Sequence, residues 1–437
     1  MRPTDALPHP ADWNTTTVGQ SVGVKRGVSW SKEQEHSRPG ADRVPVIGIR
    51  NVQDRLDLTD LLFLSGLRPA ALDKTRVSAG WTIIVGSNGN RARIGNAVLV
   101  REHAGFLFAS FLIGAKPTAD SALSSDYFFR WLSTEQVQAY LSASSEGTTG
   151  LSNLSHTFFR AMSVPVPPPD EQAAIARILD AVDTALERTR AAVERARELR
   201  TSLIQELLSR GIAREEQRGS AAGCIPKSWA FDALGKHLAE GPTNGVYRPE
   251  SDYAAHGTRI IRIDDFEDGQ IKSIERLRRV VVEPIIQTRY AVAQDDVLIN
   301  RVNSLSHIGK ATLVPPLHES TIFESNMMRV RCGPGLLPAF LNLVLCSDIA
   351  RRHWLARAKP AVNQASVNQR DARELPVPIP RTRDEQDEIV AIVSAAQKQI
   401  DNLSHVGTAQ QQVKRSLMHD LLTGRVRVRD ASKAAAS

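Results

Sequence analysis

The sequence predicts an α+β protein made of two similar halves, each a mixed helix-and-strand domain followed by one long helix. The stretch "PVPPPDEQAAIARILDAV" beginning at Pro165 returns as "PVPIPRTRDEQDEIVAIV" beginning at Pro376. Apolar residues at heptad spacing follow both copies, and this spacing is typical of helices that pack along a seam. We therefore expect two tandem α/β domains joined by two long antiparallel coiled-coil helices, with pseudo-two-fold symmetry.

The repetition extends along nearly the whole chain at an offset of 214 residues. The offset changes to 216 at the first anchor and to 211 at the Pro-Val-Pro turns, as small loop insertions would cause. Because separate anchors agree over so much of each half, chance similarity does not account for them. The anchors are "WNTTTVG" (Trp13) with "WAFDALG" (Trp229), "VIGIRNVQD" (Val46) with "IIRIDDFED" (Ile260), Ile94-Gly95 with Ile308-Gly309, and "SLIQELLS" (Ser202) with "SLMHDLLT" (Ser416).

The first part of each half is a domain in which short β-rich runs are bounded by Gly, Asn and Ser. Trp81–Val85, Ala97–Val100 and Val297–Ile299 are predicted strands on this pattern. Each domain also carries one predicted helix, Asp126–Leu141 in the first and Pro338–Ala358 in the second. Asp can cap a helix and Pro is tolerated in a first turn. We expect each domain to be a compact α+β fold.

A long helix follows the first domain. Asp170 can cap its start, and Gly211 is suited to its end. Between them a seam with alternating steps of four and three is interrupted by one polar residue, Arg200. The predicted seam residues are Ile175, Leu179, Val182, Leu186, Thr189, Val193, Ala196, Leu203 and Leu207, with Gln172 in the first turn.

The second long helix repeats this pattern but is weaker in the middle. Gly407 costs roughly 1 kcal/mol relative to Ala in a helix interior, so we expect irregularity there, and Gly424 is expected to end the helix. Its predicted seam residues are Ile389, Val393, Ala396, Ile400, Leu403, Gln410, Leu417 and Leu421, with Gln386 in the first turn.

Each long helix is expected to extend roughly 60 Å at about 1.5 Å per residue, so its apolar stripe needs a partner of similar length. The simplest partner is the other helix; the alternative is that each helix packs on its own domain. The predicted parts of the chain are a first domain at 1–165, a first long helix at 166–212, a second domain at 213–375, a second long helix at 376–426 and a disordered tail at 427–437.

Charge and composition limit the class of protein. The formal net charge is +7, and the segments 170–210 and 384–425 hold more Asp and Glu than Lys and Arg. The positive excess therefore lies outside the long helices, where contact with a polyanion would need it. The three cysteines, Cys224, Cys332 and Cys346, lack CxxC spacing, which favours buried thiols in a reducing compartment. No signal peptide or membrane-spanning apolar run is evident, so we expect a soluble cytoplasmic protein.

The sequence lacks the common catalytic motifs. It contains no GxxxxGK[ST] phosphate loop, no GxGxxG, no HExxH and no Asp/Asn-Pro-Pro-aromatic signature of an amino-methyltransferase. Single histidines such as His307 and His353, and the carboxylate pairs at 264–265 and 295–296, fit structural or solvated positions better than acid–base work. We therefore expect recognition without catalysis, and no cofactor or metal bound by this chain.

Polar, basic loops recur at matching places in the two halves. They correspond in position but differ in sequence, whereas the helices and turns stay alike, as two readers of different sequences would require. Arg and Lys suit guanine edges and phosphates, and Asn and Gln suit adenine edges. The loops are 24–34, 86–95 and 144–153 in the first half and 240–250, 300–310 and 359–370 in the second. The candidate DNA-binding residues are Lys25, Arg26, Trp30, Lys32, Asn88, Asn90, Arg91, Arg93, Asn244, Tyr247, Arg248, Arg301, Asn303, Ser304, His307, Lys310, Asn363, Gln364 and Asn368.

Three elements occur twice: W-x4-[VL]-G at the start of each half, the "PVPxP" turn leading to Asp-Glu-Gln, and the helix ending "SLxxxLL". With domains of recognition size between them, this pattern resembles the specificity subunits of type I restriction-modification systems, over about residues 10–426. The resemblance implies two target recognition domains separated by two spacer helices. It also assigns the seam residues, together with Asp170, Gln172 and Gln386, to spacer packing and subunit docking.

The resemblance further implies the partners. Each recognition domain would read one half of a bipartite site in double-stranded DNA, and the spacer helices would fix the gap. Two methyltransferase (M) subunits carrying S-adenosylmethionine would dock on the spacer helices and domains, and two restriction (R) motor subunits using ATP and Mg²⁺ can join them. The chain itself would bind no cofactor and no membrane.

Two other functions stay open on the sequence. A nuclease or methyltransferase with an unrecognised motif would turn over DNA on its own, and a non-catalytic coiled-coil adaptor would bind only protein. Binding of DNA that is selective for a short motif and falls steeply with salt separates a DNA reader from an adaptor.

Overall fold

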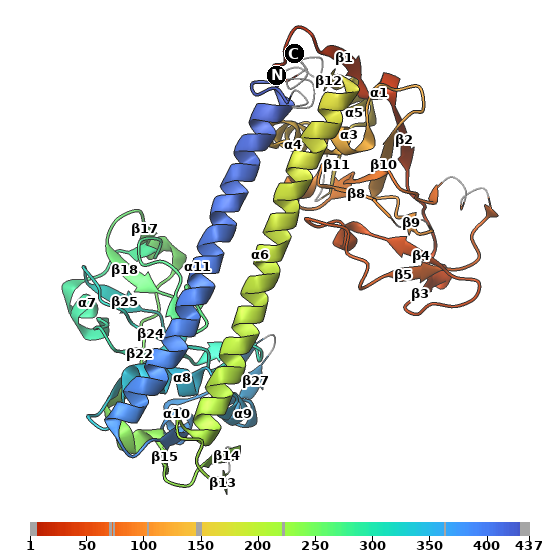
Figure 1. Ribbon diagram of the computed structural model, residues 1–437. Helices are drawn as coiled ribbons and strands as arrows, with labels where there is room; N and C mark the ends of the chain where they lie inside the picture. Colours follow the sequence, from red (N-terminus) through yellow and green to blue (C-terminus); the bar gives the residue numbers. More distant parts are fainter. Residues whose placement is uncertain are drawn as a thin grey trace. The chain divides into compact units, whose positions relative to one another are not determined.

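Two long helices dominate the secondary structure (Figure 1). In the computed structural model, α6 (Pro169–Arg210) and α11 (Arg383–Leu422) run without interruption through 42 and 40 residues. The structure describes residues 7–69, 72, 75–102, 105–145, 151–220, 223–361 and 364–428. The chain divides into unit 1, which is Met1–Thr189 with Val406–Ser437, and unit 2, which is Arg190–His405. Each unit therefore contains one domain and about half of each long helix.

The domain of unit 1 is built on two four-stranded sheets. Its strands are β1 (Asn14–Thr17), β2 (Val22–Arg26), β3 (Glu35–His36), β4 (Val44–Ile47), β5 (Leu62–Leu64), β6 (Thr82–Val85), β7 (Ser87–Asn88), β8 (Ala97–Leu99), β9 (Leu107–Phe108), β10 (Leu112–Pro117), β11 (Ser152–Asn153) and β12 (Ser163–Val166). The sheet orders are β2-β10-β6-β8 and β3-β5-β4-β9, and only the β4–β9 pair within them is parallel. Two short antiparallel pairs, β1-β12 and β7-β11, complete the domain.

The domain of unit 2 repeats this topology. Its strands are β13 (Gln217–Ser220), β14 (Gly223–Pro226), β15 (Ala230–Ala233), β16 (Leu238–Asn244), β17 (Tyr253–Ala254), β18 (Thr258–Ile261), β19 (Phe266–Glu267), β20 (Gln270–Ile271), β21 (Arg279–Val280), β22 (Val297–Asn300), β23 (Val302–Asn303), β24 (Ala311–Leu313), β25 (Thr321–Phe323), β26 (Met327–Cys332), β27 (Lys359–Ala361), β28 (Gln364–Ser366) and β29 (Pro376–Ile379). The order β16-β26-β22-β24 matches the first sheet of unit 1, and β17-β21-β18-β25 matches the second. The parallel pair β18–β25 corresponds to β4–β9, and β15-β29 corresponds to β1-β12.

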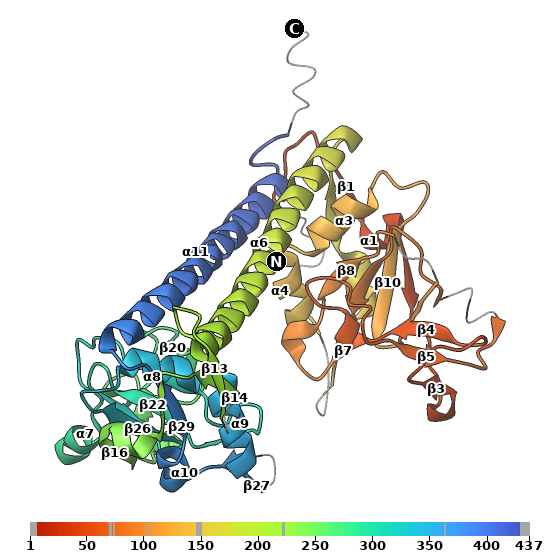
Figure 2. The same cartoon turned by 60° about the horizontal axis from the view of Figure 1, so that its bottom comes forward.

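Short helices cover the sheets of both domains (Figure 2). Those of unit 1 are α1 (Val18–Ser21), α3 (Ser125–Leu132), α4 (Glu135–Ala143) and α5 (His156–Ala161), and those of unit 2 are α7 (Pro284–Tyr290), α8 (Pro338–Leu345), α9 (Asp348–Arg357) and α10 (Gln369–Arg373). Short 3₁₀ turns are η1 (Lys32–Gln34), η2 (Ile49–Asn51), η3 (Arg91–Arg93), η4 (Leu234–His237) and η5 (Glu250–Asp252).

The three predicted strands are present as β6, β8 and β22, but the prediction of one continuous helix in each domain was wrong. The first predicted helix is divided into α3 and α4, and the second into α8 and α9. A new helix begins in each case because a hydroxyl side chain caps it. Thr134 accepts from the backbone N–H of Val137, and Ser347 accepts from that of Ile349.

The proline-rich stretches before the long helices form strands, and the prediction of a turn there was wrong. Pro165 lies in β12, opposite Thr15 of β1, and Pro378 lies in β29, opposite Phe231 of β15. Both ladders have only two strands, so a strand without every N–H donor is tolerated. The last strand of each domain therefore pairs with its first strand, and the long helix leaves from this closure.

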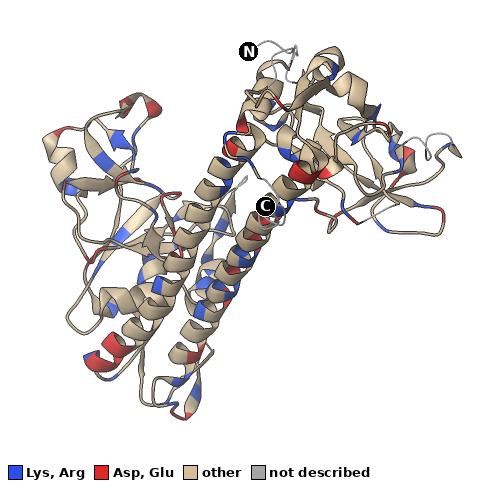
Figure 3. Ribbon diagram, turned by 45° about the horizontal axis from the view of Figure 1, so that its top comes forward, with Lys and Arg blue, Asp and Glu red and all other residues tan. Residues whose placement is uncertain are grey.

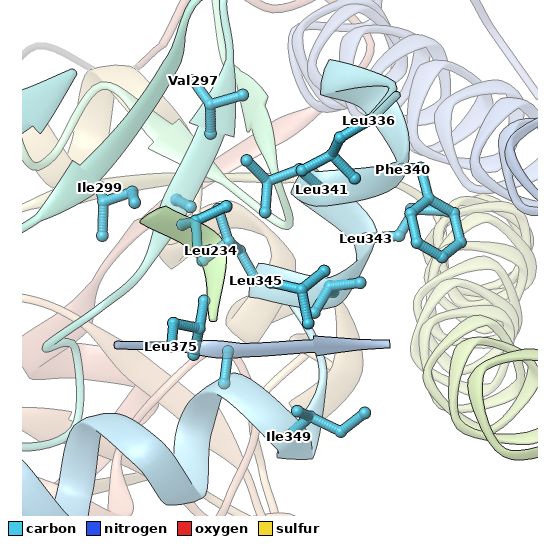
Figure 4. Packing of buried hydrophobic residues seen from close by; sticks show 14 of the residues in the cluster. Leu234, Val297, Ile299, Leu336, Phe340, Leu341, Leu343, Leu345, Ile349 and Leu375 are labelled. Carbon is cyan, nitrogen blue, oxygen red and sulfur yellow. The ribbon is translucent and has the colours of Figure 1, made fainter. Parts of the chain in front are cut away.

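Each unit has its own main hydrophobic core. In unit 1, aromatic residues of α3 such as Phe128 and Trp131 are buried with Ile175 and Leu179 of α6. In unit 2, six of the eight residues of α8 are buried, and Leu341 and Leu345 lie near Leu234 in Figure 4. Phe340 lies on the side of α8 toward the long helices, with its ring centroid 6.1 Å from that of Trp229. The helix starts are thus part of the domain cores.

Within unit 1, the first half of α6 runs antiparallel to the second half of α11. Asp183 contacts Lys414 at 2.7 Å, and Thr189 lies closest to Gly407, where an added Cβ would be 3.6 Å from its methyl group. Gly407 thus lies inside a continuous helix, and the expected irregularity there was wrong. Leu421 and Leu422 of α11 are buried in the same core as the start of α6.

Within unit 2, the end of α6 and the start of α11 share one core. Leu207 and Ile204 of α6 are buried with Ile389 and Val393 of α11. The polar residue predicted to break the seam, Arg200, is also buried, and its Nη2 donates to the backbone carbonyl of Asp268 at 3.0 Å. All residues predicted for the two seams are buried or half-buried. In both units the long helices contact each other and also a domain. The two packing alternatives, helix on helix and helix on its own domain, therefore occur together.

The repeated Asp-Glu-Gln motif fixes the start of each long helix to its own domain. The buried side chain of Gln172 accepts from the backbone N–H of Ser124 at 2.8 Å and donates to the carbonyls of Ala122 and Pro167 at 2.8 and 2.9 Å. Gln386 does the same in unit 2, with Leu337 and Gly335 as partners at 2.9 and 3.0 Å. Neither amide is available to another subunit. Asp170, in contrast, is exposed in the first turn after Pro169.

The glutamates of the same motif bind the tryptophan that opens each half. Glu171 accepts from the indole N–H of Trp13 at 3.1 Å, and Glu385 accepts from that of Trp229 at 3.3 Å. The opposite ends of the helices reach these same places. Gly211 ends α6 near Glu385 and Trp229, and Gly424 ends α11 near Trp13. Both glycines have a positive φ, 65° and 64°, as expected for helix C-termini.

Arg427 joins the two ends of the chain in unit 1. Its guanidinium contacts Glu171 and Asp12, each at 2.8 Å. The N–H of Val428 also donates to Glu171, at 3.3 Å. The fold therefore extends two residues beyond the predicted start of the tail, and residues 429–437 lie outside the described residues.

An ion-pair cluster connects three helices of unit 1. The buried guanidinium of Arg130 in α3 contacts Asp180 and Asp183 of α6, and Lys414 of α11 contacts Asp183. Burial opposes ionisation of Asp183, but the hydrogen bonds and positive charges of Lys414 and Arg130 outweigh it and lower the pKa of this carboxyl.

We predict that Gln172→Ala destabilises the protein by about 1–3 kcal/mol, because it removes a buried side chain that serves one backbone N–H and two carbonyls. The measurement is the urea midpoint of unfolding of the full chain. The matched control is Gln411→Ala, at an exposed position of α11, which should leave the midpoint unchanged. Equal midpoints for the two variants would contradict the role given to Gln172.

We predict that Asp183→Asn lowers the free energy of unfolding at pH 7 by about 1–2 kcal/mol, because Arg130 and Lys414 lose a charged partner. Since the pKa of Asp183 is lowered in the fold, its contribution is present above the ordinary pKa of about 4 and is lost as the pH falls through the folded value. Unfolding curves between pH 7 and pH 2 should therefore converge for the variant and the wild type. Asp120→Asn, at an exposed turn position, is the control, and a difference that persists at the lowest pH argues against the ion pair.

Candidate nucleic-acid interface

The structure joins two of the three predicted loops in each unit by a short β-ladder. In unit 1, β7 in the loop 86–95 pairs with β11 at the end of the loop 144–153. In unit 2, β23 in the loop 300–310 pairs with β28 in the loop 359–370. Loops that are far apart in the sequence therefore form one surface in each unit.

The first loop of unit 1 meets this surface at a tight turn between β9 and β10. The turn, Ala109–Leu112, is closed by a hydrogen bond from the N–H of Leu112 to the carbonyl of Ala109 at 2.9 Å. Its Phe111 carbonyl accepts from the N–H groups of Gly86 and Ser87 at 2.9 and 3.0 Å. On the other side, Ser110 N–H donates to Val28 of the first loop at 2.9 Å. We call this segment the central turn of unit 1.

Unit 2 has the same central turn at Glu324–Met327. The carbonyl of Asn326 accepts from the N–H groups of Arg301 and Val302 at 2.8 and 3.2 Å, and Ser325 N–H donates to Val246 at 3.0 Å. These bonds correspond one by one to those of unit 1. The backbone that positions the three loops is therefore the same in both units.

Two equivalent glycines let the first loop approach the central turn. A Cβ at Gly27 would lie 2.1 Å from the carbonyl oxygen of Ala109, and one at Gly245 would lie 2.2 Å from that of Glu324. Any side chain would force the loop away from the turn. The glycines therefore fix where the side chains of the first loop begin.

The candidate residues on the first loop of unit 1 differ in how far their side chains are engaged by other groups of the protein. The ammonium group of Lys25 lies 5.0 Å from the ring centroid of Trp81. Arg26 is exposed, and its Nε donates to the carbonyl of Ser110 at 3.3 Å. Trp30 is half-buried and donates to Glu35 at 2.7 Å, whereas Lys32 is exposed in η1. Lys32 and Arg26 thus present the most accessible positive charge here.

The two arginines of the second loop have structural partners. Arg91 donates from Nε to Ser142 and from Nη2 to Ala143, at 2.8 and 2.5 Å, and so binds the carbonyls at the end of α4. Arg93 donates to the carbonyl of Val52 at 2.9 Å. The side chains of Asn88 and Asn90 accept from backbone N–H groups of their own loop. These residues hold the loop in shape, a role that the sequence did not indicate.

In the first loop of unit 2, Tyr247 is the prominent candidate. Its side chain is 73% exposed. Arg248 is engaged by Asp252 and Glu283 at 3.4 and 3.5 Å. Asn244 is half-buried, and its side-chain oxygen finds no hydrogen-bond partner among the described residues.

The second loop of unit 2 presents a polar cluster. The hydroxyl of Ser304 lies 2.9 Å from Nδ1 of His307, and both follow Asn303, whose side chain accepts from the N–H of Ser304 at 2.8 Å. Lys310 lies over the ring of Phe266 at 5.6 Å. Arg301 is partly committed to the central turn, because its Nη1 donates to the carbonyl of Ser325 at 3.1 Å.

The third loop of each unit is described only in part. Gln364 is exposed in β28, whereas Asn368 caps α10 by accepting from the N–H of Asp371 at 3.0 Å. Asn363 and residues 146–150 lie outside the described residues.

Sequence reasoning missed the residues of the central turn. Phe111, in the central turn of unit 1, is 49% exposed. Leu305, which was also missed, lies in the second loop of unit 2 and is 51% exposed. Phe111 lies in the apolar run "FLFASFLIGA", which indicates a buried strand. The signal that could have found the turn is the repeat itself, since Ala109–Leu112 and Glu324–Met327 are 215 residues apart.

Other candidate groups have structural roles. His353 is buried, its Nε2 lies 2.7 Å from the carbonyl of Asp371, and burial lowers its pKa. Asp296 is buried against Arg331 at 2.6 Å. Cys224 is exposed, so the expectation that all three cysteines are buried was wrong for this one, whereas burial raises the pKa of Cys332 to about 12.

Lys and Arg are found on the long helices as well as on the domains (Figure 3). In the part of the chain that the structure describes, no group of three or more His, Cys, Asp or Glu side chains could hold a metal ion. Among the same residues, none of the helices is both long and apolar enough to cross a bilayer.

Comparisons with known sequences point to one family. A family model described as the type I restriction modification DNA specificity domain matches residues 10–195. The StySPI specificity subunit from Salmonella potsdam is 23% identical over 434 residues, which cover 96% of this chain and 91% of that protein. The EcoKI specificity subunit from Escherichia coli K12 is 23% identical over 435 residues with the same coverage. Both are specificity subunits of type I restriction enzymes, which agrees with the expectation that this chain is not catalytic by itself.

Solved structures share the fold. The S subunit of a type I restriction-modification system from M. genitalium covers 96% of this chain and 99% of its own, with a TM-score of 0.51 and 15% identity. A chain from a structural study of complex assembly in the type I restriction-modification system gives a TM-score of 0.52, with the same coverage and 16% identity. The duplicated domain and the repeated Trp and Asp-Glu-Gln contacts accompany similarity, over nearly the whole length of the chain, to the specificity subunits of type I restriction-modification systems.

Proposed function

We propose that each unit reads one half of a bipartite site in double-stranded DNA. The observation that carries this proposal is the duplicated framework of the central turn. The same backbone hydrogen bonds position three loops in each unit, while the side chains on those loops differ. A constant framework with different side chains suits the reading of two different base sequences by one kind of domain.

The accessible groups on the loops have the chemistry that DNA requires. Arg26 and Lys32 in unit 1 offer positive charge to phosphates, and Tyr247 in unit 2 offers a ring for packing on a sugar or base. Ser304 and His307 offer hydrogen-bonding groups. Arg91 and Arg93, in contrast, bind backbone carbonyls of the protein and hold the second loop in shape. We propose that they affect DNA binding only through the shape of this loop.

We further propose that α6 and α11 set the gap between the two half-sites. Each helix is continuous through the point where the units divide, near Thr189 and Val406. Each helix is also fixed at its start by a buried glutamine. A helix held in this way resists bending and so transmits a defined spacing. We propose that the two spacer helices are antiparallel and related by pseudo-two-fold symmetry.

The partners follow from the family. We propose that two methyltransferase subunits dock on the spacer helices and domains and that two restriction subunits can join them in the cytoplasm. S-adenosylmethionine, ATP and Mg²⁺ would then be bound by those subunits. An adaptor that binds only protein is less well supported, because it does not account for two different sets of polar loops on one repeated framework.

A selection experiment tests the proposed function. The full chain with its methyltransferase partner should enrich one bipartite motif from randomised duplex DNA, and its affinity should fall steeply between 50 and 200 mM salt, by about 10³-fold or more if six or more phosphates are neutralised. Enrichment of no motif, or binding that is insensitive to salt, would contradict the proposal.

A pair of variants locates the surface. Tyr247→Ala should weaken binding of the selected duplex by about five- to tenfold, because a packing ring is lost. Ile285→Ala is the control and should leave the binding unchanged. Ile285 in α7 is 75% exposed and so of similar accessibility. Titration of the selected duplex measures both, and an equal loss in the two variants would place the DNA elsewhere.

A deletion tests the spacer. Removal of one heptad around Thr189 from α6 and one around Gly407 from α11 preserves the seam and shortens each helix by about 10 Å. We expect the same two half-sites with a gap shorter by about one to three base pairs. Selection from the randomised library measures this, and altered half-site sequences would show that the helices also take part in base reading.

A further inference from the structure

The middle residue of the central turn differs in kind between the two units. The turn reads Ala109-Ser110-Phe111-Leu112 in unit 1 and Glu-Ser-Asn-Met at 324–327 in unit 2. The serines are identical, and Leu112 and Met327 are both buried. Phe111 and Asn326 are therefore an aromatic and an amide on one and the same backbone.

The position of this residue is fixed by its own carbonyl group. That of Phe111 accepts two backbone N–H groups at 2.9 and 3.0 Å, and that of Asn326 accepts two at 2.8 and 3.2 Å. The donors, Gly86 with Ser87 and Arg301 with Val302, belong to the second loop. The residue after it is bonded to the first loop. The middle residue therefore lies where the first and second loops meet, and the position of its Cα is restricted.

The Phe111 ring is not used by the core. It is 49% exposed, whereas the neighbouring Phe108 and Leu112 are buried in the core of unit 1. Single exposed apolar residues are common, but this one is held at the centre of polar and basic loops. Asn326 is half-buried, and no hydrogen bond of its side chain occurs among the described residues. An unused ring and an unused amide thus stand at one position.

The neighbouring difference, Ala109 against Glu324, has an internal explanation. The carboxylate of Glu324 accepts from the N–H of Ile263 at 2.6 Å and lies near Arg262 at 3.7 Å. The carboxylate of Glu324 is therefore engaged by internal contacts that hold the chain around it. The middle residue is the one whose side chain has no such internal task.

We propose that Phe111 and Asn326 are equivalent specificity-determining residues, each contacting a base of its own half-site; this rests on the proposed reading of DNA by the units. Phe111 makes an apolar contact, for which the methyl group of thymine is the best-suited partner on a base edge. Asn326 makes a hydrogen-bonded contact, for which adenine is the best-suited partner, because an amide can both accept from and donate to its edge.

An exchange of the two side chains tests this proposal. Phe111→Asn and Asn326→Phe are made separately in the full chain with its methyltransferase partner, and each is used to select from randomised duplex DNA. Each variant should change the preferred base at one position of one half-site, by about ten- to hundredfold in relative affinity. The other half-site and the gap should stay unchanged. Ile285→Asn, an exposed apolar residue changed to the same amide, should select the wild-type motif.

The outcomes separate this proposal from the proposed function. If the wild type enriches a bipartite motif and both variants enrich the identical motif, the role of Phe111 and Asn326 is overturned while the reading of DNA stands. A variant that weakens both half-sites equally, with a lowered unfolding midpoint, also overturns it, because the residue then acts through stability. If the wild type enriches no motif, the proposed function itself fails.

Discussion

A buried glutamine side chain at the start of each long helix is the contact on which the rest of the structure depends. Gln172 and Gln386 satisfy backbone groups in the loop that leads into α3 and α8, and the preceding glutamates hold the tryptophan that opens each half. Helix, first strand and main core are therefore fixed to one another at a single place in each unit.

This contact explains why the sequence repeats where it does. A buried amide that serves both an N–H and carbonyl groups cannot be replaced by a residue with only one of these functions. The side chains of the loops are under no such restriction. At the central turn, a glycine and the backbone hydrogen bonds of four residues are sufficient to hold the loops in place. Strict repetition at the helix starts and free variation at the loop tips are two results of the same duplication.

Much of the fold could be predicted, because the signals are local. Heptad spacing identified both long helices, and the residues of the two seams are buried or half-buried as expected. The strand at Pro165 could not be predicted, because its partner near Thr15 lies about 150 residues away. The division between α3 and α4 was missed because Thr134 caps a helix inside a stretch of helical periodicity. On the loops, the directions of the side chains could not be predicted. The residue type of Arg91 does not indicate that its guanidinium binds carbonyl groups of α4.

The joining of the chain ends by Arg427 has a consequence for synthesis of the protein. Unit 2 is one continuous segment, Arg190–His405, whereas unit 1 needs Val406 and the residues after it. Until these leave the ribosome, Ile175 and Leu179 lack Leu421 and Leu422, and Glu171 lacks its arginine. The first domain to be made is thus the last to be completed, so the part of its helix face that contacts α11 stays uncovered during translation of more than half the chain.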